Sequence, residues 1–98
     1  MKNTYTEELK RLYQAILSLE TEEDCIDFFE DICTIKERKD ISQRLQVAKM
    51  LNEGFNYQEV SKTTGASTAT ICRVNKCLNY GTGAYRKALE KIGNGDKE

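Results

Sequence analysis

Gly65 stands between two short stretches of sequence whose apolar and small residues follow helical spacing. The residues that would share one face are Tyr57, Val60, Ser61 and Thr64 before the glycine, and Ala66, Ile71, Val74 and Leu78 after it. A glycine adopts a left-handed bend without steric cost, and Ser67 is of the type that caps a helix N-terminus. The segment 56–79 therefore predicts two short helices joined by a tight turn, a helix-turn-helix.

The opposite face of the second predicted helix carries short polar side chains, methyl groups and two cations. Its members are Ser67, Thr68, Ala69, Cys72, Arg73 and Lys76. Such a surface can approach base edges in a major groove and hold the flanking phosphates. An ordinary helical hairpin in an α-helical core is the alternative. The agreement of core spacing, turn glycine, cap and outward chemistry favours a DNA-binding surface.

The rest of the chain also indicates helices. It has 98 residues and no proline, and its apolar residues show no strand-like alternation. Capping residues at Thr4, Thr21 and Thr34, the last paired with Glu37, predict helices over about 4–17, 22–33 and 35–53, and a last helix follows Gly83. In the third helix the expected apolar residues are Ile41, Leu45, Ala48 and Leu51, widened by Val47 and Met50. The fold class is all-α, with a single domain over 1–93 and a flexible tail over 94–98.

Charge is distributed unevenly along the chain. Residues 1–34 contain three basic and nine acidic residues, whereas residues 35–98 contain twelve basic and seven acidic ones. A basic second half suits a polyanion such as DNA. The segment 20–31 carries seven acidic residues and no basic one. A protein-interaction module that docks a basic partner on this acidic face is therefore an alternative function, and a solvated helix face is the simpler reading.

The sequence gives no support for an enzyme, a metal site or a bound cofactor. It has no histidine, no glycine-rich phosphate loop and no nucleophile with an evident base nearby. The four cysteines form no Cys-x-x-Cys pair, so free thiols in a reducing compartment are expected. There is no signal peptide and no apolar run of membrane-spanning length, so we expect a cytoplasmic protein with no membrane partner.

The first two predicted helices have wide apolar faces. The residues expected to contribute most are Leu9, Leu12, Ile16, Phe28, Phe29 and Ile32. These faces could complete a monomeric core, but a homodimer would present two recognition helices to two half-sites. We therefore expect a homodimer in which these residues form a combined core.

The segment from Thr34 to Leu78 resembles the Trp repressor family, and within it the YerC/YecD branch of Trp-repressor-like proteins. The resemblance is carried by Thr34-x-x-Glu37, by Gln43-Arg44 leading into Val47-Ala48-x-x-Leu51-x-x-Gly54, and by the run Gly65-Ala66-Ser67-Thr68-Ala69-Thr70-Ile71-x-Arg73 with Asn75-x-x-Leu78. It implies six helices and an intertwined homodimer. It also implies two helix-turn-helix units in successive major grooves of an operator.

The resemblance also assigns roles to individual residues. It puts Thr68, Ala69 and Cys72 at base edges, and it makes Ser67 and Thr70 the residues that cap and steady their helix. Gln58, Ser61 and Lys62 would lie near phosphates. Arg44 and Arg73 match the two arginines that enclose the indole of a tryptophan corepressor, and Arg73 would also bind its carboxylate.

Two residues depart from the pattern for tryptophan binding. Val74 stands where the family has a glycine against which the ligand packs, and Cys77 replaces a serine that helps to hold the amino group. A valine side chain would occupy much of the space that an indole needs. We therefore expect a sequence-specific DNA-binding transcriptional regulator, a repressor on a palindromic operator, that acts without tryptophan. The sequence leaves three roles open for Arg73: ligand binding, phosphate contact or a salt bridge.

Overall fold

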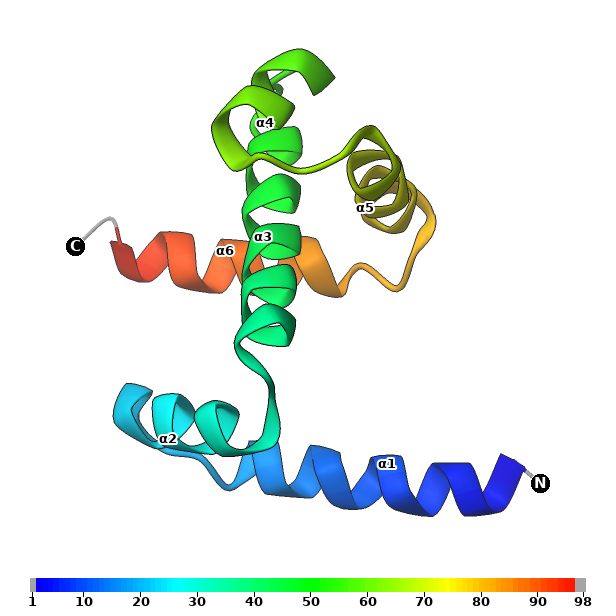
Figure 1. Cartoon of the computed structure of the whole chain (residues 1–98), viewed down its shortest axis with the longest axis vertical. Helices are drawn as coiled ribbons and strands as arrows, with labels where there is room; N and C mark the ends of the chain where they lie inside the picture. The colour runs from blue at the N-terminus through cyan, green and yellow to red at the C-terminus, as the bar shows by residue number, and fades with distance from the viewer. Residues whose placement is uncertain (1, 97–98) are drawn as a thin grey trace. The chain divides into compact units, whose positions relative to one another are not determined.

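The computed structural model describes the backbone of residues 2–96 and the side chains of residues 6–93. These residues form α1 (Lys2–Leu17), α2 (Glu22–Ile32), α3 (Ile35–Asn52), α4 (Tyr57–Thr64), α5 (Thr68–Tyr80) and α6 (Ala84–Asp96) (Figure 1). The described residues contain no strand, so the all-α prediction is confirmed. The chain divides within α3 into unit one, up to Arg38, and unit two, from Lys39 onward.

Short side chains at the helix starts fix several of these boundaries. The backbone N–H of Asp24 donates to Thr21 Oγ1 over 3.0 Å, and the carboxylate of Asp24 accepts from the N–H of Thr21. Thr34 and Glu37 form the same reciprocal pair at the start of α3, with distances of 3.0 and 2.8 Å. Each pair satisfies N–H groups that a helix start leaves without partners. The predicted caps of α2 and α3 are therefore confirmed.

The outer ends of the chain differ from the prediction. α1 begins at Lys2, two residues before the expected start at Thr4, and the side chain of Thr4 lies outside those described. α6 continues to Asp96, beyond the expected end at Gly93. Residues 97–98 lie outside the described residues, and the flexibility of the tail stays a prediction.

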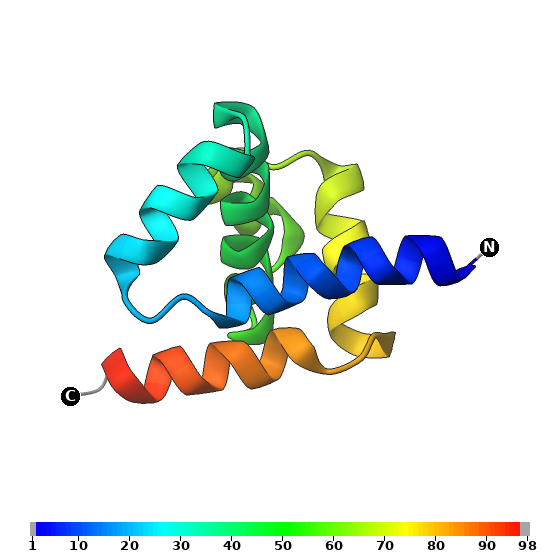
Figure 2. The same ribbon diagram turned by 90° about the horizontal axis from the view of Figure 1, so that it is seen from below.

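Unit one consists of α1, α2 and the first turn of α3. Figure 2 shows α1 and α2 joined by a short turn. Although Phe28 and Phe29 meet edge to face at 5.4 Å between ring centroids, both rings are only half-buried. None of the described side chains of unit one is buried, and Leu17 exposes 83% of its surface. A hollow of about 500 Å³ between α1 and α2 is lined by Leu12, Ala15, Phe28 and Ile32 and by the charged residues Glu7, Glu8 and Arg11.

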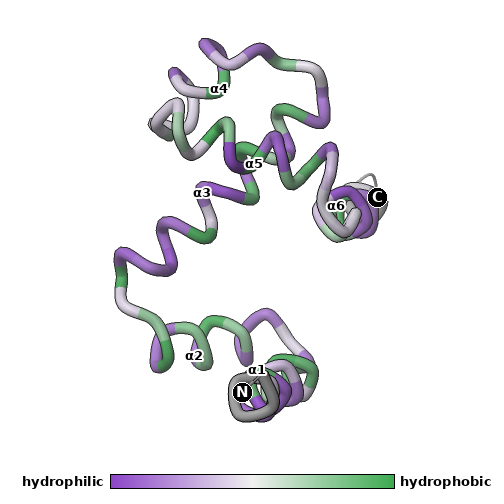
Figure 3. Tube along the Cα trace, turned by 90° about the vertical axis from the view of Figure 1, so that its right-hand side faces the viewer, coloured by the Kyte–Doolittle hydropathy of each residue, from purple (hydrophilic) through white to green (hydrophobic). Residues whose placement is uncertain are grey.

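Unit two has a core of its own. Its buried apolar residues are Val47, Ala48 and Met50 of α3, Val60 of α4, Ala66 of the turn, Ile71 and Val74 of α5, and Leu89 of α6. α6 crosses α3 in Figure 1 and contributes Leu89 to this core. Figure 3 shows apolar stretches in both units, so what separates the two is packing rather than hydropathy.

The apolar face of α3 differs from the prediction. Ile41 and Leu45 expose 50% and 38% of their surface, whereas Val47 and Met50, expected only to widen the face, are buried. The reason is tertiary, because α4, α5 and α6 pack on the side of α3 that carries Val47, Ala48 and Met50. Spacing within one helix cannot show which part of a broad apolar face its neighbours will cover.

Candidate nucleic-acid interface

The turn between α4 and α5 is fixed by a set of hydrogen bonds around Gly65. Gly65 has φ +76°, the left-handed conformation that only glycine adopts readily. Ser61 Oγ donates to the carbonyl of Ala66 over 3.1 Å, and the N–H of Ala66 donates to Thr64 Oγ1 over 3.1 Å. Gln43 Nε2 on α3 donates to the carbonyl of Thr64 over 3.1 Å. Hydrogen bonds within the turn thus fix the bend, and a further one joins it to α3.

Two of the predicted contact residues hydrogen-bond to each other at the start of α5. Ser67 is the N-cap, and its Oγ accepts from the N–H of Thr70 over 3.2 Å. The same hydroxyl donates to Thr70 Oγ1 over 3.2 Å. The capping role predicted for Ser67 is therefore confirmed, while Thr70 is half-buried beside it.

The two faces of α5 separate as the sequence predicts. Ile71 and Val74 are each 1% exposed and Leu78 is 6% exposed. All members of the predicted DNA-binding face within α5 are exposed, namely Thr68, Ala69, Cys72, Arg73 and Lys76. Ala69 and the last three of these follow the i, i+3, i+4, i+7 spacing of a single helix face. α5 carries two cations and no acidic residue, so this face is positive.

Sequence reasoning missed the residue that holds the C-terminal end of α5. Arg86 of α6 donates from Nε to the carbonyl of Leu78 over 3.3 Å and from Nη2 to Asn79 Oδ1 over 3.1 Å. Its Nη1 donates to Asn52 Oδ1 at the end of α3. The last carbonyls of a helix lack intrahelical partners and attract a cation. One guanidinium thus joins α3, α5 and α6, and the only signal in the sequence was a basic residue in the first turn after the Gly81–Gly83 bend.

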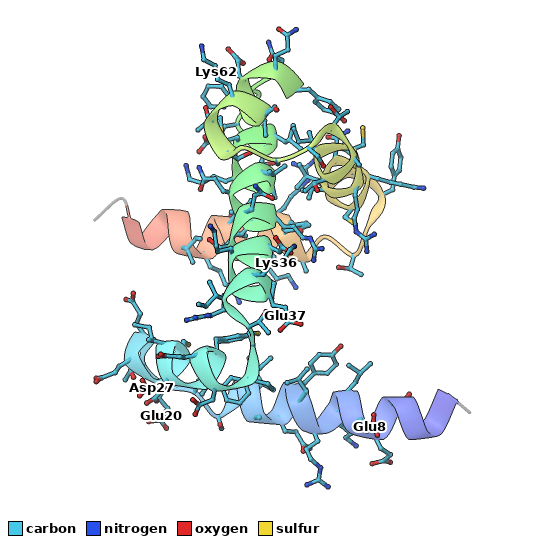
Figure 4. The ribbon with its side chains drawn as sticks, viewed as in Figure 1. Glu8, Glu20, Asp27, Lys36, Glu37 and Lys62 are labelled. Atoms are coloured by element: carbon cyan, nitrogen blue, oxygen red, sulfur yellow. The ribbon has the colours of Figure 1, made fainter. Side chains whose placement is uncertain are left out.

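The predicted phosphate contacts lie on α4. Gln58 and Lys62 are exposed, whereas Ser61 is half-buried and its hydroxyl is engaged within the turn. Figure 4 shows Lys62 extending away from the body of unit two. A hollow of about 330 Å³ between α4 and α5 is lined by Tyr57, Gln58, Ser61, Lys62, Thr68 and Ile71. The hydroxyl, amide and ammonium groups around it are hydrogen-bond donors that suit an oxygen-rich polyanion.

The position expected to decide ligand binding is filled. Val74 is 1% exposed and belongs to the same core cluster as Val47, Ala48 and Leu89. Arg44, Arg73 and Cys77 are exposed, and among the described residues Arg44 and Arg73 make no hydrogen bond or ion pair. The valine methyl groups are therefore part of the core, and the two arginines are not fixed to any partner within residues 6–93.

The remaining candidate groups lie elsewhere. The seven acidic residues of segment 20–31 are exposed, and Figure 4 shows Glu20 and Asp27 extending outward from unit one. All four cysteines are free thiols, and only Cys33 is half-buried. Within the described residues there is no group of three or more side chains placed to hold a metal ion. No helix in the same part of the chain is long and apolar enough to cross a membrane.

Comparison with known proteins agrees with this arrangement. A model of the Trp repressor protein family matches residues 7–93. The chain belongs to the Trp repressor family. Within that family it falls in the YerC branch, because it is 53% identical over 85 residues to YerC of Bacillus subtilis (strain 168), a protein described as uncharacterized. That match covers 87% of this chain and 82% of YerC.

Crystal structures of two relatives show the same fold. A TrpR-like protein from Eubacterium eligens is 48% identical, with a TM-score of 0.87 over 95% of this chain and 96% of that one. A relative from Staphylococcus aureus is 46% identical, with a TM-score of 0.85 over 89% of this chain and 87% of that one. The six-helix Trp-repressor-like fold predicted from the sequence is therefore confirmed.

Proposed function

We propose that this protein is a sequence-specific DNA-binding transcriptional regulator that represses by occupying a palindromic operator as a homodimer. The observation that carries the proposal is the exposed face of α5. It joins small groups of base-reading size at Thr68, Ala69 and Cys72 to cations at Arg73 and Lys76. The Trp repressor family is a family of regulators, and membership gives no support to an enzymatic role.

In this proposal the charged residues supply affinity and the small ones supply selectivity. Lys62, Arg73 and Lys76 neutralise phosphates and release counterions, so binding weakens as salt rises. The hydrogen bond from Gln43 to the Thr64 carbonyl and the hydrogen bonds from Arg86 hold α4 and α5 in a fixed position relative to α3. A preorganised pair of helices loses little freedom on binding DNA. The regulator would act in the cytoplasm, where the DNA and the reducing conditions suited to four free thiols are found.

The homodimer is supported by the state of unit one. Its described side chains include no buried residue, and large apolar groups such as Leu17 and Ile35 expose 83% and 70% of their surface. Covering one such side chain contributes about 1.5–3 kcal/mol. A second copy of the chain would cover the faces of α1 and α2 and give Phe28, Phe29 and Ile32 a core. The acidic face of α2 stays exposed in either case, and docking of a basic protein there remains the alternative function.

We further propose that DNA binding needs no tryptophan. Val74 lies in the core where a tryptophan-binding member would leave room for an indole. Displacing its methyl groups by a ligand would overpack a closely filled region, which typically costs about 1–3 kcal/mol. Arg44 and Arg73 are then free to contact phosphates.

Selection of bound duplexes from a random pool, performed with and without added tryptophan, tests these proposals together. We expect a salt-sensitive, twofold-symmetric site to emerge equally in both conditions. An absence of any enriched duplex would contradict DNA recognition. Enrichment only in the presence of tryptophan would retain DNA recognition but contradict ligand independence. Binding to basic proteins without any duplex would favour the alternative on α2.

A further inference from the structure

We infer that α5 recognises its DNA through the C5-methyl groups of thymine, read by three small side chains near its N-terminus. This inference rests on the proposed DNA binding and names what that surface reads. The three side chains are those of Thr68, Ala69 and Cys72. The inference concerns the chemistry of their contacts, and it excludes guanine or adenine edges as their main targets.

The hydrogen bonds at the start of α5 leave the side chains of these three residues available to contact base edges. Ser67 Oγ already accepts from the Thr70 N–H and donates its proton to Thr70 Oγ1, so the Ser67 hydroxyl has no donor left for a base, and Thr70 is half-buried. Thr68, Ala69 and Cys72 are exposed and have no side-chain hydrogen bond among the described residues. In a helix-turn-helix the N-terminal residues of the second helix face the base edges.

The chemistry of the three side chains limits what they can recognise. Guanine is selected by two donors from arginine or lysine, and adenine by the paired donor and acceptor of asparagine or glutamine. A methyl group, a hydroxyl with its methyl, and a thiol offer none of these bidentate pairs. Thymine alone displays a methyl group in the major groove, and alanine and threonine methyls are suited to contact it.

The cations of α5 lie further along the helix. Arg73 and Lys76 follow Ala69 by four and seven residues, which is one and two turns toward the C-terminal end. Phosphate contacts from that part of the helix set affinity and carry little sequence information. Selectivity is thus left to the small side chains of the first turns.

The contacts that hold α5 in place make methyl contacts with the DNA feasible. Apolar contacts act over a short range, since a gap of 0.5–1 Å already loses a quarter to a half of the attraction. α5 is held at its N-terminal end by the Ser67 cap and at its C-terminal end by Arg86, and Ile71 and Val74 anchor its inner side. The absence of bulk at Ala69 also lets the helix backbone approach the groove floor.

Replacing thymine by uracil tests the inference, because uracil lacks only the C5-methyl group. The preferred duplex from the random pool is remade with uracil at one thymine position at a time, and its affinity for the full-length protein is measured. We expect about a fourfold loss for each contacted methyl, the equivalent of one buried methyl group. Substitution of the symmetric pair of positions should lose about sixteenfold, because the two losses multiply. Uracil outside the selected site should have no effect.

Two variants of Thr68 connect the effect to a side chain. Thr68→Ser removes the methyl group and keeps the hydroxyl, whereas Thr68→Val keeps methyl groups and removes the hydroxyl. Because both protomers carry the change, we expect Thr68→Ser to lose about sixteenfold on the thymine site and to abolish the uracil penalty at one symmetric pair of positions. Thr68→Val should keep that penalty. Thr63→Ser on the exposed side of α4 removes the same methyl group away from α5 and serves as the control.

The outcomes separate this inference from the proposed function. If no duplex is selected at all, DNA recognition itself fails. If a site is selected but full uracil substitution leaves its affinity unchanged, DNA recognition stands and the methyl readout is overturned. The readout is also overturned if the uracil penalty persists at every position in Thr68→Ser, Ala69→Gly and Cys72→Ser, because the methyl groups are then sensed by another part of the protein.

Discussion

Unit one and unit two are built from similar helices but reach different degrees of burial. Unit two buries residues from α3, α4, α5 and α6 around Val47, Val60 and Val74. Unit one has no buried residue among its described side chains, although α1 and α2 carry apolar stripes of their own. An apolar stripe stabilises a fold only when another element covers it. Unit two finds its cover within the chain, and in the proposed homodimer a second copy of the chain covers unit one.

The two units also differ in charge. Unit one carries five basic and ten acidic residues, and unit two carries ten basic and six acidic ones. A basic unit with a completed core suits binding to a polyanion, and an acidic one is kept from the same surface by repulsion. This difference fits the proposed function, in which unit two contacts DNA and unit one forms the dimer.

The largest expected effect comes from placing a charge in the apolar face of unit one. Phe29→Glu should unfold the protein or convert a dimer to monomers, because the half-buried ring would lie in the combined core of two chains. Light scattering coupled to size exclusion and circular dichroism would measure mass and helix content. Tyr80→Glu, at a residue 85% exposed in unit two, should change neither. A wild-type protein that is monomeric at micromolar concentration would contradict the assignment of unit one to assembly.

A smaller effect is expected in the core of unit two. Val74→Gly should lower the free energy of unfolding by about 3 kcal/mol, since buried methyl groups are lost and glycine costs about 1 kcal/mol in a helix interior. Val74→Ala removes the same methyl groups with less backbone cost and should lose about 2 kcal/mol. Denaturant unfolding would measure both.

Val74→Gly also reopens space beside the core, so calorimetry with tryptophan would show whether it gains weak indole affinity. The wild type should show no heat of binding. Micromolar tryptophan binding by the wild type, accompanied by tighter DNA binding, would contradict the proposal that Val74 closes this site.

Loss of the hydrogen bonds from Arg86 to α3 and α5 should have a moderate effect. Arg86→Ala removes three hydrogen bonds that join α3, α5 and α6 and should lower the free energy of unfolding by about 1–2 kcal/mol. It should also weaken specific DNA binding more than non-specific binding, because a loosened α5 loses alignment with the bases. Lys87→Ala removes a neighbouring exposed cation and serves as the control. Equal losses of specific and non-specific binding in Arg86→Ala would show that Arg86 acts only through its charge.

The smallest effect should come from a single cation of unit two. Lys76→Ala should weaken all duplexes similarly and lower the slope of log affinity against log salt by about one unit for each protomer of the dimer, because each protomer loses one phosphate contact. Lys10→Ala, in unit one, should leave the slope unchanged. Equal slopes for wild type, Lys76→Ala and Lys10→Ala would remove the charge argument for unit two.

Local sequence predicted much of the fold and of the candidate site. Thr21, Thr34 and Ser67 cap helices as expected, and Gly65 takes the left-handed bend. The inner and outer faces of α5 were also predictable, because helical spacing places Ile71, Val74 and Leu78 together. These features depend on residues at most a few positions apart. The resemblance to the Trp repressor family, carried by residues 34–78, implied the same six helices, and the family model matches residues 7–93.

Contacts between distant residues could not be predicted in the same way. Nothing in the local sequence pairs Gln43 with the carbonyl of Thr64, or Arg86 with Asn52. The prediction of the buried side of α3 was likewise wrong at Ile41 and Leu45, because which side is buried depends on where α4, α5 and α6 pack.

The sequence by itself determined where the helices begin and bend, which face of α5 is polar, and how charge divides along the chain. These properties follow from backbone conformation, capping and the 3.6-residue period, all of which are local. Only the tertiary structure decided that Val47 and Met50 rather than Ile41 and Leu45 are buried, that Arg86 hydrogen-bonds to residues of α3 and α5, and that unit one lacks buried side chains among those described. The physical reason is that burial is a property of neighbours in space, and neighbours are set by the packing of elements far apart in the chain.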